Sequence, residues 1–247
     1  MGSKITLYVA RHGKTMMNSL DRVQGWCDSP LTKEGTDAAR YLGYGLSDIN
    51  FRTAYCSDLR RTAQTAGIIL ETKGQDDIPV IELPGLREAC FGSFEADFNH
   101  HMWNSAALYL HFTSAENMIK AIMEKKISYG DVLDAVKVLD KTGMAENFAQ
   151  VEARTQESLR EIAVNETQYG DGNILVISHG MSILAMLLGL GGDKLFKEPL
   201  KNAAVCKVTC QDGKFNVESM ADMGYVEKGK KIANNIKSNE ENIFVMR

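Results

Sequence analysis

The sequence predicts an α/β fold: a three-layer α/β/α sandwich with a mostly parallel central sheet and an inserted helical cap. Short runs of strand-forming residues alternate with amphipathic helical segments, which is typical of a sheet covered by helices on both faces. The segment 173–178 is apolar throughout, as strands of buried parallel sheets are. A long stretch, 98–146, carries no strand signal and interrupts the alternation. The three observations together predict the fold class.

The first half of the chain contains strand and helix signals in alternation. Strand-forming runs predict three strands, over 5–10, 53–57 and 79–83. A helix is expected to follow Thr32, because threonine is a preferred cap and apolar residues recur behind it at helical spacing. A second helix is expected over 59–70, and Gly74 ends it.

The second half repeats the alternation and closes with a hairpin. Apolar spacing predicts helices over 148–162 and 181–190, the second stopped by Gly191-Gly192. Strands are expected over 173–178, 203–210 and 214–220, the last two joined at Asp212-Gly213. The tail, 227–247, mixes charges of both signs and predicts a solvated terminal segment.

The stretch 98–146 divides the strand-bearing parts of the chain. Helices are expected over 103–126 and 131–141. Because sheet-building segments lie on both sides of it, we expect one α/β domain over 1–247, with 98–146 as a helical cap rather than a separate domain.

Composition argues against several classes of protein. Of 247 residues, 44% are hydrophobic and 24% charged, which is close to globular averages and excludes disordered and fibrous chains. Lys and Arg number 28 against 32 Asp and Glu, and the net charge of −4 disfavours nucleic acid as a partner. No apolar run approaches the roughly 20 residues that span a bilayer, so no membrane partner is expected.

The N-terminus and the cysteines predict a cytoplasmic location. Residues 1–13 lack the cleavage region of a signal peptide and instead indicate a first strand. The cysteines are odd in number and include no CxxC pair, which favours reduced thiols over disulfides or a zinc site: Cys27, Cys56, Cys90, Cys206 and Cys210. We expect no metal and no cofactor. The sequence leaves the oligomeric state open, a homo-oligomer included.

Ionisable side chains follow the predicted strand ends. In open α/β sheets, ligands bind beyond the carboxyl ends of the strands. These ends carry Arg11 and His12, then Arg60, then Glu88, then His179. Arginine matches phosphate oxygens in a bidentate way, and imidazole can act as a nucleophile. The set therefore predicts phosphoryl transfer, in which fixed cations neutralise the transferring group.

Five segments in order extend this pattern: RHGKTMMN at 11–18, QGWCDSPLTKEG at 24–35, SDLRRTAQTA at 57–66, LREACFGSFE at 86–95 and SHG at 178–180. They resemble the RHGxTxxN, QGxxDxPLTxxG, SxLxRxxQTA, LRExxFGxxEG and second-histidine motifs of the histidine phosphatase superfamily, also called the phosphoglycerate mutase-like family. The resemblance covers both halves of the expected sheet and fails across 98–146. Ala96 stands where the family often has glycine, and Phe94 where it commonly has tryptophan.

The resemblance implies a role for each matching residue. His12 would attack phosphorus and carry a transient phosphohistidine, and Glu88 would protonate the leaving oxygen and then activate water. Three cationic or donor side chains would hold the phosphoryl oxygens: Arg11, Arg60 and His179. Three neutral side chains are expected to bind phosphate or substrate: Thr15, Asn18 and Gln24.

Structural alternatives stay open for three of these residues. Asn18 could cap a helix, because asparagine is a preferred cap. Glu88 could form an ordinary ion pair with Arg87. Arg60 could be a surface arginine.

Three functions fit the expected site. The first is a metal-independent phosphatase that hydrolyses a small phosphomonoester through a phosphohistidine, because the segment 91–95 resembles the phosphatase branch of the family. The second is a phosphoglycerate mutase, an isomerase with the same residues. The third is a phospholigand-binding protein without turnover, against which Glu88 argues because binding alone does not need it. The expected partner is a small phosphorylated metabolite.

Overall fold

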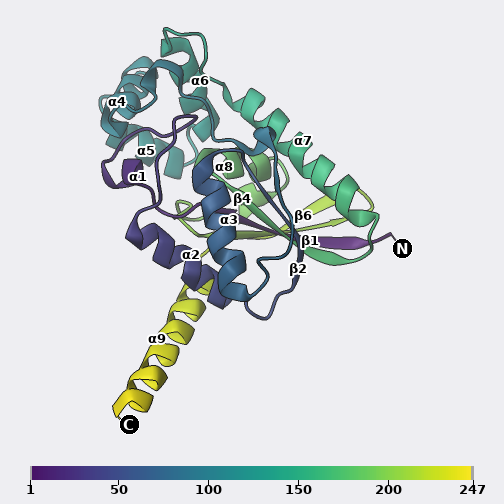
Figure 1. The fold of residues 1–247 in the computed structure, drawn as a ribbon. Helices are drawn as coiled ribbons and strands as arrows, with labels where there is room; N and C mark the ends of the chain where they lie inside the picture. The colour runs from purple at the N-terminus through teal and green to yellow at the C-terminus, as the bar shows by residue number, and fades with distance from the viewer. Residues whose placement is uncertain (1, 246–247) are drawn as a thin grey trace.

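A six-stranded mixed sheet lies at the centre of the computed structural model, which describes residues 2–245 (Figure 1). Its strand order is β3-β2-β4-β1-β5-β6. The first four strands in this order are parallel, whereas β5 is antiparallel to β1 and β6 is antiparallel to β5. The strands are β1 Lys4–Arg11, β2 Phe51–Cys56, β3 Val80–Glu82, β4 Gly172–Ser178, β5 Val205–Gln211 and β6 Lys214–Asp222. The mostly parallel α/β class is therefore confirmed.

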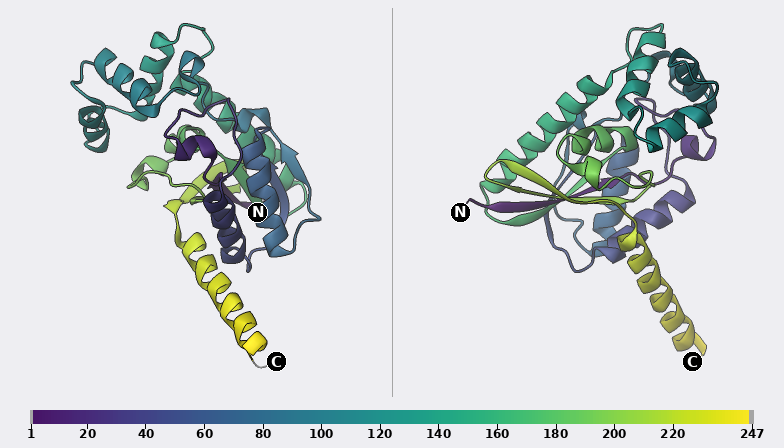
Figure 2. Two further views of the ribbon diagram at one scale, coloured as in Figure 1. Left: turned by 60° about the vertical axis from the view of Figure 1, so that its left-hand side comes forward. Right: turned by 180° about the vertical axis from the view of Figure 1, so that it is seen from behind.

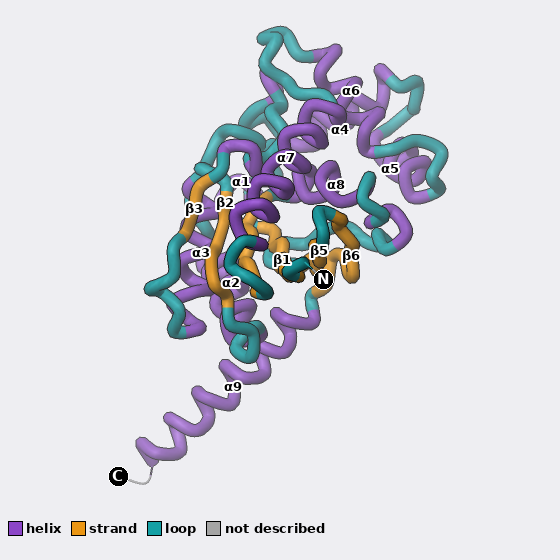
Figure 3. Tube along the Cα trace, turned by 90° about the vertical axis from the view of Figure 1, so that its right-hand side faces the viewer, coloured by secondary structure: helices purple, strands orange, loops and turns teal. Residues whose placement is uncertain are grey.

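Helices cover both faces of the sheet (Figures 2 and 3). One face packs against α7 (Phe148–Thr167) and α8 (Gly180–Leu188), and the other against α2 (Lys33–Gly45) and α3 (Arg60–Lys73). Strand β1 alternates between the two cores, with Leu7 in the first and Tyr8 in the second. This alternation follows from the period of two along a strand and gives the three layers that the sequence predicts.

The local signals in the sequence operate as expected. The hydroxyl of Thr32 accepts a hydrogen bond from the N–H of Gly35 and caps α2. Gly74 ends α3 with a φ of 67°, in the left-handed region that favours glycine. Asp212 and Gly213 have φ values of 50° and 73°, which suits the tight turn of a hairpin.

The segment 98–146 forms three helices where the sequence predicted two. These are α4 (Asn99–Tyr109), α5 (Ala115–Met123) and α6 (Tyr129–Leu139), called the cap helices below. The predicted helix over 103–126 is interrupted at His111, whose φ is 62°, and restarts at Ser114, which caps α5. No glycine or proline marks this break, so sequence patterning missed it. The cap helices lie together at one end of the molecule, away from the far end of the C-terminal helix (Figure 2).

The tail is a helix and not only a solvated segment. Helix α9 spans Gly224–Val245, and its first turns pack on α2 before it extends away from the body (Figure 1). Residues 246–247 of the predicted tail lie outside the described residues. The two helices approach closely because both carry glycine at the contact. A Cβ on Gly45 would lie 1.8 Å from the backbone oxygen of Tyr225, and a Cβ on Gly229 would lie 1.7 Å from the backbone oxygen of Tyr41.

Four short helical elements lie in the connecting segments. A four-residue helix, α1 (Met16–Ser19), was not predicted. Single 3₁₀ turns occur at η1 (Pro84–Leu86), η2 (Gly92–Phe94) and η3 (Gly192–Lys194). Among the described residues, no helix has the length and apolar character needed to cross a bilayer.

Gly229→Ala is expected to destabilise the protein by about 1–3 kcal/mol, because the new methyl group meets backbone and forces α9 off α2. The melting temperature should fall by roughly 2–12 °C in a thermal unfolding experiment. The matched control is Gly67→Ala in α3, where an added Cβ meets nothing within 4 Å. That variant should be unchanged or stabilised by up to about 1 kcal/mol. Equal melting temperatures for the two variants would show that α9 does not pack this closely in solution.

Candidate active site

The site lies where β1 and β4 end side by side. Arg11, the last residue of β1, is in register with Ser178, the last residue of β4. The next residues are His12 and His179, and their rings lie 5.1 Å apart, edge to face. The N–H of His12 donates to the Ser178 oxygen at 3.0 Å and holds the two loops together. Parallel pairing of distant segments thus brings both histidines to one place.

The hydrogen bonds of His12 determine its tautomer. Nδ1 lies 2.7 Å from the backbone oxygen of Gly13, and a carbonyl only accepts, so Nδ1 carries the proton. Nε2 then has a free lone pair, and it has no hydrogen-bond partner among the described residues. Burial, followed by the charges of Arg61 and Arg11, lowers the pKa of His12 well below its ordinary value. His12 is therefore neutral near pH 7, as a nucleophile must be.

His179 is completely buried behind His12. Its Nδ1 accepts from Nε of Arg61 at 3.2 Å, and its Nε2 lies 2.8 Å from the Ser57 hydroxyl. Because Nδ1 is the acceptor, Nε2 carries the proton and donates to Ser57. Burial and the nearby Arg61 also lower the pKa of His179 well below its ordinary value. Both ring nitrogens are thus occupied by protein groups, and His179 does not line the cavity described below.

The arginine that the sequence analysis placed here, Arg60, is not at the site. Its side chain is exposed and does not line the cavity, whereas the next residue, Arg61, is completely buried. Successive helical residues point about 100° apart, so only one of two adjacent arginines at the start of α3 can face inward. The signal was present in the sequence, since SxLxR counted from Ser57 ends at Arg61 and not at Arg60.

Arg61 connects the site to the loop that follows α1. Besides His179, its guanidinium donates to the backbone oxygens of Gly25 and Cys27 at 2.7 and 2.9 Å. It also pairs with Asp28 at 2.9 Å. The planar fork of arginine suits such a set of acceptors, and an ammonium does not. Arg61 therefore fixes the loop and the orientation of His179 together.

Glu88 is buried and bound to the N-terminus of α8. One carboxylate oxygen accepts from the N–H of Ala89 and of Ser182, both at 2.9 Å, and the other accepts from Met181 at 3.2 Å. A helix N-terminus favours such a negative charge. The ion-pair alternative does not hold, because Arg87 pairs with Asp58 instead. Arg154 also supports this segment, because its guanidinium donates to the backbone oxygen of Glu88 at 2.8 Å.

A cavity of about 240 Å³ joins these groups to the cap helices. Arg11 and His12 line it from the end of β1, and Glu88 lines it from the segment after β3. Arg11 donates through Nη1 to the Leu200 oxygen at 2.7 Å. Its buried Nε has no hydrogen-bond partner among the described residues. The cavity therefore presents a nucleophile, a cation and a carboxylate to one ligand.

The three neutral residues predicted to bind phosphate or substrate separate into two groups. Asn18 and Gln24 line the cavity, although Asn18 also completes the cap of α1 by accepting from the N–H of Thr15. The Thr15 hydroxyl donates to Gln24 at 2.5 Å. Thr15 is completely buried and does not line the cavity, so it holds Gln24 in place and does not reach a ligand.

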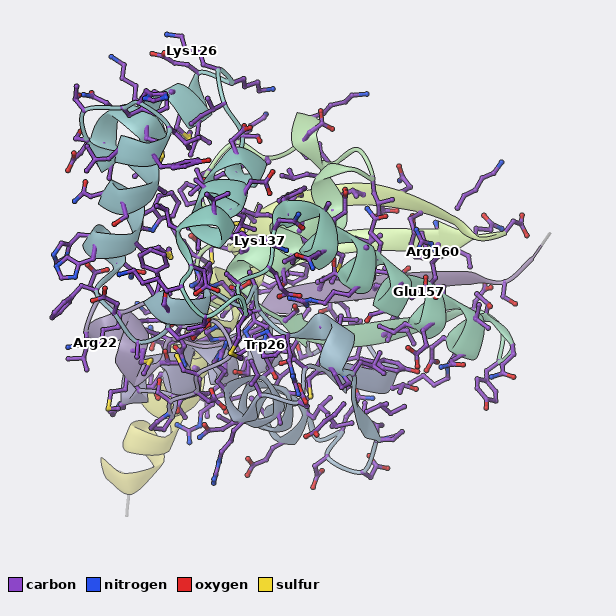
Figure 4. The ribbon with its side chains drawn as sticks, turned by 90° about the horizontal axis from the view of Figure 1, so that it is seen from above. Arg22, Trp26, Lys126, Lys137, Glu157 and Arg160 are labelled. Carbon is purple, nitrogen blue, oxygen red and sulfur yellow. The ribbon has the colours of Figure 1, made fainter. Side chains whose placement is uncertain are left out.

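Sequence reasoning also missed Arg22, which lines the cavity (labelled in Figure 4). Its Nη1 donates to the Ala96 oxygen at 2.7 Å, and its guanidinium lies 4.1 Å from the centre of the Phe98 ring. Ala96 has a φ of 64°, in the left-handed region, which explains the glycine common at this position in the family that the motifs resemble. No short motif signals Arg22, because its partners lie more than 70 residues away.

Comparison with known proteins identifies the family. A profile of the histidine phosphatase superfamily (branch 1) matches residues 7–223. The chain is 29% identical to a 2,3-bisphosphoglycerate-dependent phosphoglycerate mutase 2 of Gloeobacter violaceus, covering 81% of this chain and 80% of the relative. It is 26% identical to a metal-independent phosphoserine phosphatase of Arabidopsis thaliana, and the match covers 91% of this chain and 84% of the relative. A crystal structure of a phosphoglycerate mutase from Bacillus anthracis str. Sterne superposes with a TM-score of 0.87 at 37% sequence identity. The superposition covers 93% of this chain and 98% of the other chain.

Proposed function

Because the chain belongs to the histidine phosphatase superfamily, branch 1, we propose that it is a metal-independent phosphatase. It hydrolyses a small phosphomonoester in two steps through a phosphohistidine on His12. The observation that carries the proposal is the free lone pair on Nε2 of a neutral His12, in the same cavity as Arg11 and Glu88. These are the nucleophile, the charge-neutralising cation and the acid–base group that such a reaction needs.

In the first step, Nε2 of His12 attacks phosphorus and the bond from phosphorus to the ester oxygen breaks. Arg11 donates to the phosphoryl oxygens, on which charge accumulates. Glu88, in its protonated form, gives its proton to the leaving oxygen.

In the second step, water attacks the phosphohistidine. Glu88, now a carboxylate, takes one proton from the water, and the bond between phosphorus and Nε2 breaks. Free phosphate and neutral His12 result, so the cycle closes. The Glu88 carboxylate is held for this step by backbone N–H groups at the start of α8.

Glu88→Gln is expected to slow hydrolysis of an alkyl phosphate by about 10²–10⁴-fold, because the amide cannot deliver a proton to a poor leaving group. An aryl phosphate with a good leaving group should lose much less in its first step. Steady-state rates of phosphate release on the two esters measure this difference. Equal losses on both esters, or a loss below about tenfold on the alkyl ester, would assign proton transfer to another residue.

The second candidate is a phosphoglycerate mutase. It is favoured by two of the relatives above, which are described as phosphoglycerate mutases. Incubation with 3-phosphoglycerate separates the two functions: a phosphatase releases inorganic phosphate, and a mutase forms 2-phosphoglycerate while retaining the phosphoryl group. Formation of 2-phosphoglycerate without release of phosphate would overturn the proposed function.

A further inference from the structure

We infer that the substrate's leaving group carries an apolar group of about the size of a phenyl ring and no second acidic group. The inference rests on the proposed function, since it names the substrate class of the same cavity. Three features of the cavity carry it: the apolar wall, the scarcity of cations, and the size.

The wall of the cavity that the cap helices and α8 form is mostly apolar. Its apolar side chains include Met102, Trp103, Tyr129, Leu133 and Met181, and Phe196 joins them from the segment after η3. Asn99 on α4 also lines the cavity, and its side-chain amide donates to Asp21 at 2.8 Å. Leu133 and Met102 also belong to the core of the cap. Trp103, Tyr129, Met181 and Phe196 are only half-buried, so they retain surface that a ligand can cover. Core packing alone therefore does not account for this wall.

Cations are scarce on the same wall. The segment 98–146 contains no arginine, and none of its lysines lines the cavity. Lys126 points outward from the far end of the cap (Figure 4), with 70% of its side chain exposed. Arg11 and Arg22 are the cations among the described residues that line the cavity. Arg22 already donates through Nη1 to the backbone oxygen of Ala96, and its guanidinium lies against the Phe98 ring. With Arg11 on the phosphoryl group, a second acid would have to share Arg22 with these partners, so its burial would be poorly compensated and costly.

The size of the cavity suits a ring. A volume of about 150 Å³ suffices for benzene in an apolar cavity, and the 240 Å³ found here leaves room for a phosphoryl group beside it. Tyr129 and Phe196 pack edge to face, with ring centroids 6.1 Å apart, and both also line a second cavity beyond them. The two rings form a wall between the cavities, which limits the length of the occupant.

Binding to the His12→Ala variant tests the inference without turnover. The ligands are 3-phenylpropyl phosphate, glycerol 3-phosphate and 3-phosphoglycerate, which are all esters of aliphatic alcohols, measured by isothermal titration calorimetry. Burial of a phenyl ring is expected to make the first bind about 10–100-fold more tightly than the other two. Equal affinities, or tighter binding of 3-phosphoglycerate, would overturn the inference.

Two further variants locate the apolar contact. Adding Tyr129→Ala to His12→Ala should reduce the preference for the phenyl ester by at least about fivefold, with glycerol 3-phosphate binding unchanged. The matched control is Tyr109→Ala on α4, which is 46% exposed and does not line the cavity, and it should leave the preference intact. If Tyr129→Ala does not fold, the ligand ranking on His12→Ala decides alone.

The failure of this inference is distinguishable from failure of the proposed function. Phosphate release by the unaltered protein from both the phenyl ester and glycerol 3-phosphate tests hydrolysis, whichever ester is preferred. Release of phosphate with equal binding of the ligands would leave a phosphatase of different specificity. A strong binding preference for the phenyl ester without any release of phosphate would support the inferred ligand class and disprove the hydrolytic function.

Discussion

His12→Ala is expected to abolish phosphate release, by at least about 10⁴-fold on an aryl phosphate, because no other group replaces the attacking nitrogen. Among the described residues, Nε2 of His12 is the imidazole nitrogen that both lines the cavity and lacks a protein partner. The measurement is the initial rate of phosphate release. Rapid quench in base followed by mass spectrometry should find a phosphoryl group on His12 in the unaltered protein.

The control for this prediction is His100→Ala, since His100 is exposed and does not line the cavity. Its rate should stay within about twofold of the unaltered protein, as for most surface substitutions. Substantial residual activity in His12→Ala, or a phosphoryl group found on another residue, would disprove nucleophilic catalysis by His12.

Arg61→Lys is expected to lower kcat/KM by about 10²–10³-fold, whereas Arg60→Lys should leave it within about twofold. Lysine keeps the charge of Arg61 and loses the planar fork that binds His179, the Gly25 oxygen and Asp28 together. The loop and His179 are then no longer held against each other. Arg60 is exposed at the first turn of α3, and the same substitution there removes no such contact.

The measurement is kcat/KM of the Arg61→Lys and Arg60→Lys variants on an aryl phosphate, and thermal unfolding tests whether each variant folds. Equal losses in both variants would mean that Arg60 also reaches the phosphate. If Arg61→Lys does not fold, Arg60→Ala still decides the placement, because an arginine that binds phosphate would cost at least about 100-fold when removed.

Much of the fold could be predicted because its signals are local. The strand-forming run before His12, the Thr32 cap and the Gly74 stop each depend on a few neighbouring residues. The hairpin likewise follows from Asp212-Gly213 between two strand-forming runs. Where local signals were weak, prediction failed: no glycine or proline marks the break at His111, and α9 depends on its contact with α2.

The candidate site divides in the same way. Residues that directly follow a strand could be placed from the sequence, because parallel neighbours end at one edge, and the structure brings Arg11, His12 and Glu88 to one cavity. Thr15 could not be placed so, because its side-chain direction depends on how α1 docks. The motif spacing from Ser57 points to Arg61, so the placement of Arg60 was an error in counting the motif. Arg22 and Arg154 act through backbone oxygens far along the chain, which no motif spacing encodes.

By itself, the sequence determined the α/β class, the order of the elements and which histidines follow strands, since periodicity and capping are properties of short segments. How the cap divides into three helices follows only from the tertiary structure. The same holds for the apolar side chains that share a cavity with His12. These features arise from contacts between segments distant in the chain, where burial selects one orientation among several that local patterning allows.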